Sequence, residues 1–212
     1  MITLTKEELI FFNNVTKGPA PFGVVLRYPR WRDAEELKEE IVASLQEKGI
    51  LDEERKITQY GMIPLLLWEE YRNARRHVVL NEVYFAMLPG GRMTGLREWE
   101  GKYCLMTGRG EEILMELLKG SEFLRSADRK GEHYASREVD YETWSRAMHR
   151  IDGGMVIAGS FMDKEPEKEV VYYWDENRGY QYDLNKERER QLQPRQLRLR
   201  LMELLNVQEG GR

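Results

Sequence analysis

The order in which helical and strand-like stretches follow one another is the feature that most restricts the fold of this chain. Stretches with helical periodicity come first, three strand-like stretches follow, and the same order begins again near residue 109. Grouped helices and grouped strands are typical of α+β folds, whereas a βαβ fold alternates them singly. The sequence therefore predicts one α+β domain over residues 1–212. Two similar halves, 1–108 and 109–207, would share an antiparallel or mixed sheet, and 208–212 would form a flexible tail.

Three helices are expected in the first half. Capping boxes at Thr5 and Asp33 predict the starts of the first two. The third is expected from about Thr58 to Ala74, but proline is favoured in a first helical turn, so Pro64 offers an alternative start. The inward side of this third helix is expected to carry Tyr60, Ile63, Leu67, Trp68, Tyr71 and Ala74.

Each half is expected to contain three strands. Val78–Leu88 is apolar at both alternating positions, which is typical of a strand covered on both faces. The other predicted strands are Arg92–Trp99, Lys102–Thr107, Met155–Phe161, Glu169–Trp174 and Gly179–Leu184. The predicted helices of the second half are Ile113–Gly120, Ser121–Leu124, Tyr141–Arg150 and a closing helix after Pro194. The polar stretch Ser126–Ser136 is expected to be a mobile loop.

Composition excludes several protein classes. Of the 212 residues, 41% are hydrophobic and 33% are charged, so the chain can build a core and is not bulk-disordered. A single Cys104 cannot form a disulfide within the chain. The longest apolar run, Met62–Trp68, is far shorter than the roughly 18 residues that span a bilayer. Because residues 1–8 also lack the features of a signal peptide, the sequence predicts a cytoplasmic protein.

No motif predicts catalysis, a cofactor or a metal ion. His77, His133 and His149 have unrelated spacing, and no His-x-x-x-His pair is present. Cys104 lies in a predicted strand without a neighbouring base, as is typical of a small buried residue. The turn Thr107–Gly110 precedes a helix but lacks a phosphate-loop pattern. The sequence therefore predicts a non-enzymatic protein with no catalytic, cofactor-binding or metal-binding residues. A small-molecule enzyme of unknown class stays as an alternative.

A second alternative is nucleic-acid binding through the basic C-terminal helix. The basic residues in this region are Lys186, Arg188, Arg190, Arg195, Arg198 and Arg200. Basic side chains on a helix can follow a phosphate backbone. However, Glu187 and Glu189 interrupt the series, and the chain as a whole is acidic, with a pI of about 5.6. Nucleic acid is therefore an unlikely partner.

The aromatic hairpin near residue 175 carries the candidate protein-binding residues, which are Tyr172, Trp174, Tyr180 and Tyr182. Successive strand side chains point to opposite faces, so both faces of this hairpin are aromatic. One face could bind a protein partner, because aromatic side chains dominate interface hot spots. Alternatively, a helix covers each face and these side chains belong to the core.

The chain also resembles a known family. A helix that begins within Leu4–Leu9 is followed by the segment Leu45–Glu54, by another helix and by a series of hydrophobic strands, and the scheme then repeats. In this order the chain is similar to EspG-type chaperones of the type VII secretion system. It is closer to the shorter accessory proteins of Gram-positive bacteria with low GC content.

The resemblance implies a pseudo-two-fold α+β fold and no cofactor. It also implies a cytosolic chaperone or adaptor that binds a secreted helical protein and keeps it soluble before export. It supplies no site residues, because no binding motif matches residue by residue. The oligomeric state is left open.

Overall fold

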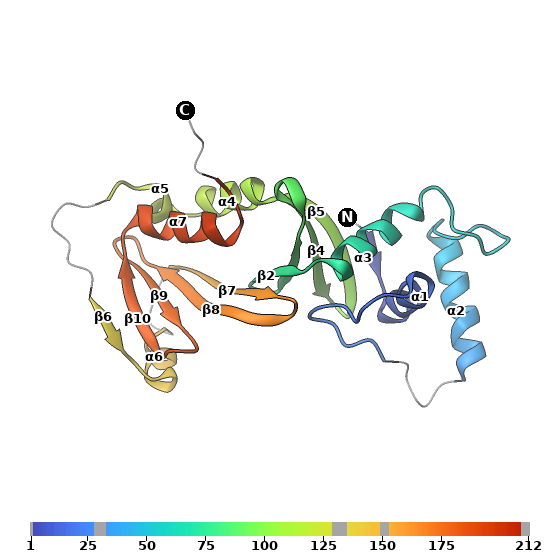
Figure 1. Cartoon of the computed structure of the whole chain (residues 1–212), viewed down its shortest axis with the longest axis horizontal. Helices are drawn as coiled ribbons and strands as arrows, with labels where there is room; N and C mark the ends of the chain where they lie inside the picture. Colours follow the sequence, from blue (N-terminus) through green and yellow to red (C-terminus); the bar gives the residue numbers. More distant parts are fainter. Residues whose placement is uncertain (1, 28–32, 129–134, 149–152, 209–212) are drawn as a thin grey trace.

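The computed structural model describes residues 2–27, 33–128, 135–148 and 153–208. These residues form one antiparallel sheet of ten strands, with helices on both of its faces (Figure 1). The strand order across the sheet is β1-β5-β4-β3-β2-β7-β8-β9-β10-β6. The α+β fold predicted from the sequence is therefore confirmed, and the sheet is antiparallel rather than mixed.

The elements have the following bounds. The strands are β1 (Ile2–Leu4), β2 (Arg76–Leu80), β3 (Val83–Met87), β4 (Arg92–Trp99), β5 (Lys102–Arg109), β6 (Ser136–Glu138), β7 (Gly154–Met162), β8 (Glu165–Trp174), β9 (Gly179–Asp183) and β10 (Arg188–Leu192). The helices are α1 (Lys6–Thr16), α2 (Ala34–Glu47), α3 (Met62–Asn73), α4 (Gly110–Lys119), α5 (Glu122–Arg125), α6 (Tyr141–Met148) and α7 (Pro194–Leu204), with a 3-10 turn at Pro89–Gly91.

The two halves repeat one order of elements. In each repeat a three-residue strand is followed by at least one helix, by a meander of four strands and then by at least one helix. The second repeat therefore begins at β6, after α4 and α5, and not near residue 109 as the sequence predicted. In each half the short first strand pairs antiparallel with the last strand of the meander, as β1 does with β5 and β6 with β10. The halves meet where β2 pairs antiparallel with β7. We call this β2–β7 junction the seam.

Each half has four meander strands instead of the predicted three. In the first half, the predicted strand Val78–Leu88 is two strands, β2 and β3, which turn at Asn81 and Glu82. Asn81 adopts a left-handed φ of 53°, which asparagine tolerates better than most residues. In the second half, β10 was missed because Arg188, Glu189 and Arg190 resemble a solvated charge run.

The capping predictions are confirmed, and one helical face differs from its prediction. Asp33 caps α2, and Thr5 forms a reciprocal capping box with Glu8 at the start of α1. Helix α3 begins at Met62, so Pro64 lies in its first turn. Tyr60 therefore precedes the helix and is exposed, and Ile63 points to solvent. The end of the predicted helix at Arg150 and part of the predicted loop 126–136 lie outside the described residues.

The helices cover the two sheet faces differently. One face, which we call the closed face, packs against α4, α5 and α7 across both halves. The other, which we call the open face, packs against α1, α2 and α3 at one end and against α6 at the other. Figure 1 shows α6 and α1 at opposite ends of the molecule, with the β7–β8 hairpin between them. Within the part of the chain that the structure describes, no helix therefore lies over the centre of the open face.

Candidate protein-binding site at the seam

The structure places the four sequence-predicted binding residues in or beside the core. Tyr172 and Trp174 lie on the closed face, in the hydrophobic cluster that contains the α7 leucines. Tyr182 lies on the open face under α6 and is fully buried, and Tyr180 is half-buried against this cluster. Of the two interpretations of this hairpin, the structure shows the one in which a helix covers each face. The hairpin is therefore not the exposed binding surface that we expected.

Ring contacts hold this aromatic cluster together. The Tyr182 ring stacks on Trp144 of α6 with ring centroids 4.2 Å apart, and the Tyr180 ring stacks on Tyr173 at 4.9 Å. The Tyr182 hydroxyl donates a hydrogen bond to the Val139 carbonyl at 2.9 Å. Because these rings are engaged with each other, they stabilise the packing of α6 and offer little area to a partner.

Side chains reinforce both ends of the seam. At one end, the Asn81 N–H donates to the Ile157 carbonyl at 2.8 Å, and the Ile157 N–H donates to Asn81 Oδ1 at 2.9 Å. At the other end, Arg75 forms a bidentate ion pair with Asp163, with N···O distances of 3.0 and 2.7 Å. The arginine thereby holds the pKa of Asp163 below its usual range. The seam is therefore a platform that side-chain interactions tie at both ends.

The open face of this platform exposes apolar side chains. Met155 is 48% exposed and Ile157 is 44% exposed, although both lie in β7 near the middle of the sheet. On the neighbouring strand, Val79 is half-buried. Cross-strand register places all three on the same face as Tyr84 and Leu96. We call Met155, Ile157 and Val79 the apolar strip.

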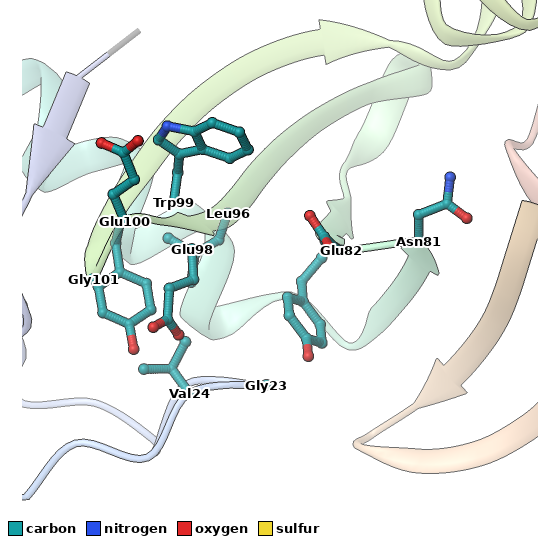
Figure 2. Close-up of a pocket in the computed structure, with 11 residues that line it drawn as sticks. Gly23, Val24, Asn81, Glu82, Leu96, Glu98, Trp99, Glu100 and Gly101 are labelled. Carbon is teal, nitrogen blue, oxygen red and sulfur yellow. The ribbon is translucent and has the colours of Figure 1, made fainter.

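A pocket of about 550 Å³ adjoins the apolar strip. It lies where the β2–β3 and β4–β5 hairpin ends face the loop that follows α1 (Figure 2). Its lining residues are Gly23, Val24, Asn81, Glu82, Tyr84, Leu96, Glu98, Trp99, Glu100, Gly101 and Tyr103. Tyr84, which lines the pocket, is the cross-strand neighbour of Val79, and Asn81, which also lines it, bonds to the backbone of Ile157. The pocket therefore adjoins the strip.

The pocket is acidic and aromatic. Figure 2 shows the Glu98 carboxylate pointing toward Val24, across the pocket, whereas the Glu100 carboxylate points away from Glu98. Burial, together with the hydrogen bond and charge of Glu98, raises the pKa of Tyr103 to about 12. The Tyr103 phenol, which is protonated near neutral pH as in any tyrosine, can donate to the Glu98 carboxylate. Among the described residues, none of those that line the pocket is a lysine, an arginine or a histidine.

Glu82 is the lining carboxylate with a cationic neighbour. Arg97 Nη2 lies 3.2 Å from Glu82 Oε2, and the Arg97 guanidinium lies 4.6 Å from the centre of the Trp99 ring. Trp99 itself is half exposed. Within the described residues, neither Glu98 nor Glu100 forms an ion pair. Beside the pocket, one guanidinium therefore already lies against the Trp99 ring and pairs with Glu82, while the Glu98 and Glu100 carboxylates have no cationic partner among the described residues.

The other candidate residues lie elsewhere. Among the described residues, no group of three or more His, Cys, Asp or Glu side chains could hold a metal ion. His77 and Cys104 are buried, whereas His133 and His149 lie outside the described residues. In the described part of the chain, no helix has the length and apolar character needed to cross a membrane.

The basic C-terminal residues do not form one helical stripe. Arg188 and Arg190 belong to strand β10, while Arg195, Arg198 and Arg200 belong to α7. Arg198 donates to the carbonyls of residues 124 and 126, at 2.6 and 2.9 Å. The basic residues of this region are thus divided between a strand and the closing helix, which begins at Pro194 as predicted.

A family comparison matches nearly the whole chain. The model of a domain of unknown function, DUF5081, matches residues 3–209, which include the seam, the pocket and both halves. The chain belongs to the DUF5081 family. Among curated proteins, none matches it. Because the description of the DUF5081 family names no activity, a function for this DUF5081 domain has to be inferred from its surface.

Sequence reasoning missed the residues of the apolar strip. A signal was present, because β7 is apolar on both alternating faces, with Met155 and Ile157 on one face and Val156 and Ala158 on the other. This pattern predicts a strand covered on both sides. The pattern alone does not show that the helix over one of those faces is absent.

Proposed function

We propose that this protein is a cytosolic adaptor that binds a helical protein of a type VII secretion system and keeps it soluble before export. The observation that carries the proposal is the apolar strip at the seam, which lies on a central strand without a covering helix. Exposed apolar residues beside a polar rim mark interaction sites in soluble proteins. The resemblance of the chain to EspG-type chaperones supplies the class of partner.

The dimensions of the strip suit a helical partner. Met155 and Ile157 are two residues apart on one strand face, which separates them by about 7 Å. Side chains at i and i+4 of a helix are about 6 Å apart, so neighbouring anchors on one helical face can contact both residues. Such helix-in-groove binding would shield the apolar face of a substrate that otherwise aggregates.

A double substitution tests this function. Met155→Thr with Ile157→Thr removes apolar area, while threonine keeps a side chain that is favourable in strands. Loss of interface anchors should cost about 2 kcal/mol, or about 30-fold in affinity for a helical secreted protein that co-purifies with the parent. The measurement is co-purification of that protein, followed by titration calorimetry.

Met115→Thr is the matched control. Met115 is 51% exposed, similar to the strip residues, but it lies on α4 over the closed face. The control should bind normally, and both variants should keep the melting temperature of the parent. Equal binding by the parent and the strip variant would contradict the location, and absence of any helical secretion partner would contradict the function.

A further inference from the structure

We infer that the segment docking on the seam is an amphipathic helix that places an arginine side chain in the acidic pocket, next to the apolar strip. This inference rests on the proposed function and specifies the chemistry of the partner. Two observations support it: the closeness of the strip to the pocket, and the charge of the pocket.

The closeness of the apolar strip to the pocket determines where a polar side chain of the partner would lie. Ile157, at the pocket end of the strip, is joined to Asn81 by two hydrogen bonds, and Asn81 lines the pocket. Neighbouring strands are about 4.8 Å apart, so the pocket begins one strand away from the strip. A helix whose apolar residues contact Met155 and Ile157 therefore presents a flanking side chain directly to the pocket.

Charge complementarity identifies that side chain as a cation. Glu82, Glu98 and Glu100 line the pocket. Arg97 pairs with Glu82, whereas Glu98 and Glu100 form no ion pair within the described residues. The carboxylates of the pocket would repel an acidic side chain of the partner. A cationic side chain would instead form ion pairs with them and would accelerate association. The Tyr103 hydroxyl donates a hydrogen bond to Glu98, which helps to hold that carboxylate in place.

The aromatic walls favour arginine over lysine. A guanidinium is planar, stacks on aromatic rings and binds a carboxylate through two parallel hydrogen bonds, whereas an ammonium is a strongly hydrated point charge. Tyr84 and Trp99 supply such rings at the pocket. Arg97 shows the same combination within the chain, because it contacts both the Trp99 ring and the Glu82 carboxylate.

The first test uses the arginine side chain itself as the probe. Nα-acetylarginine methylamide is titrated into the ¹⁵N-labelled full chain, and the Trp99 indole N–H signal is followed after assignment with Trp99→Phe. The neutral citrulline analogue is the matched probe. The arginine compound should shift the Trp99 signal with a millimolar dissociation constant, and the shift should shrink in about 1 M salt, because salt screens charge attraction.

Variants make this test specific to the pocket. Glu98→Gln keeps the size of the side chain and removes its charge, so the affinity for the arginine compound should fall by about fivefold or more. Glu176→Gln is the control, because Glu176 is an exposed carboxylate in the β8–β9 turn of the other half. Equal shifts with the citrulline analogue, or equal affinity of the Glu98→Gln variant and the parent, would overturn the inference.

The second test separates this inference from the proposed function. Affinity for the co-purified secreted protein is compared among the parent, Glu98→Gln and the Met155→Thr/Ile157→Thr variant. Weakening by both variants, with the Glu98 effect lost at high salt, supports the inference. Weakening by the strip variant alone overturns the arginine contact and leaves the adaptor function standing. Weakening by neither variant overturns the docking site and, with it, the inference.

Discussion

Asn81 joins the two halves of the sheet by acting as an additional rung of the ladder between β2 and β7. Its N–H donates to the carbonyl of Ile157, and its side-chain oxygen accepts from the N–H of the same residue. The side chain thereby does what a backbone carbonyl does inside an antiparallel pair. It continues the seam one residue beyond the end of β2, at the border between the apolar strip and the pocket.

Two substitutions of Asn81 should therefore separate the contributions of its side chain and of its backbone conformation to stability. Asn81→Gly keeps the left-handed φ and removes the side-chain acceptor, so it should cost about 1 kcal/mol. Asn81→Ala also places a less suitable residue at positive φ, which should cost about 1 kcal/mol more. Urea unfolding of the three proteins measures both steps. Identical stability of the glycine and alanine variants would contradict the backbone contribution.

Truncation of Tyr182 should affect folding rather than partner binding. Tyr182→Ala removes a buried ring that stacks on Trp144 and a hydroxyl that donates to Val139. Loss of a large buried side chain costs about 3–5 kcal/mol. Tyr182→Phe keeps the ring and should cost only about 1 kcal/mol. Thermal unfolding compares the variants, and a normally stable Tyr182→Ala protein that no longer binds its partner would refute this prediction.

Protonation of His77 should weaken the fold below neutral pH. The imidazole is fully buried, its Nε2 donates to the Tyr71 carbonyl at 3.0 Å, and its Nδ1 has no hydrogen-bond partner. Burial is the main cause that lowers the pKa of His77 from its ordinary 6.5, and the charge of Lys164 acts in the same direction. The unfolded chain therefore takes up this proton at a higher pH than the folded chain.

A fall in pH should lower the stability of the protein, because the unfolded chain binds this proton more readily than the folded chain. Stability from the neutral imidazole is complete above pH 6.5 and is lost as the pH falls below that value toward the lowered pKa. His77→Gln, which can still donate to the Tyr71 carbonyl, should reduce the loss of stability between about pH 7 and pH 5. Urea unfolding at both pH values gives the comparison, and parallel losses in the parent and the variant would argue against this role.

Gly23 should be sensitive because it lies at the pocket with a φ of +71°. A Cβ atom at this position would lie 2.6 Å from the Tyr84 ring. Gly23→Ala should destabilise the protein by about 1–3 kcal/mol, through the positive φ and the contact, and should displace the Tyr84 ring. Chemical shifts of the Tyr84 ring and urea unfolding provide the readouts. Gly49→Ala, at a positive φ with open space around it, separates the backbone cost from the contact.

Local signals in the sequence predicted most elements because they act over a few residues. The capping box at Thr5 and the strand Arg92–Trp99 appear as expected. The sequence did not predict β10, because a charged residue usually indicates a solvent-exposed position. Glu189 of this strand is nevertheless buried. Glu189 is accommodated because Arg137 pairs with it at 2.6 Å and the Tyr173 hydroxyl donates to it. Both of these partners are distant in sequence.

The sequence by itself determined the α+β class and the starts of the first helices. These properties depend on periodicity, capping and turn residues that neighbouring positions supply. Only the tertiary structure decided which apolar face stays open. Tyr182 and Ile157 both belong to apolar strands, but α6 covers Tyr182 and no helix covers Ile157. The burial of a strand residue depends on which distant segment of the chain packs over it. The pattern of residues along the strand does not contain that information.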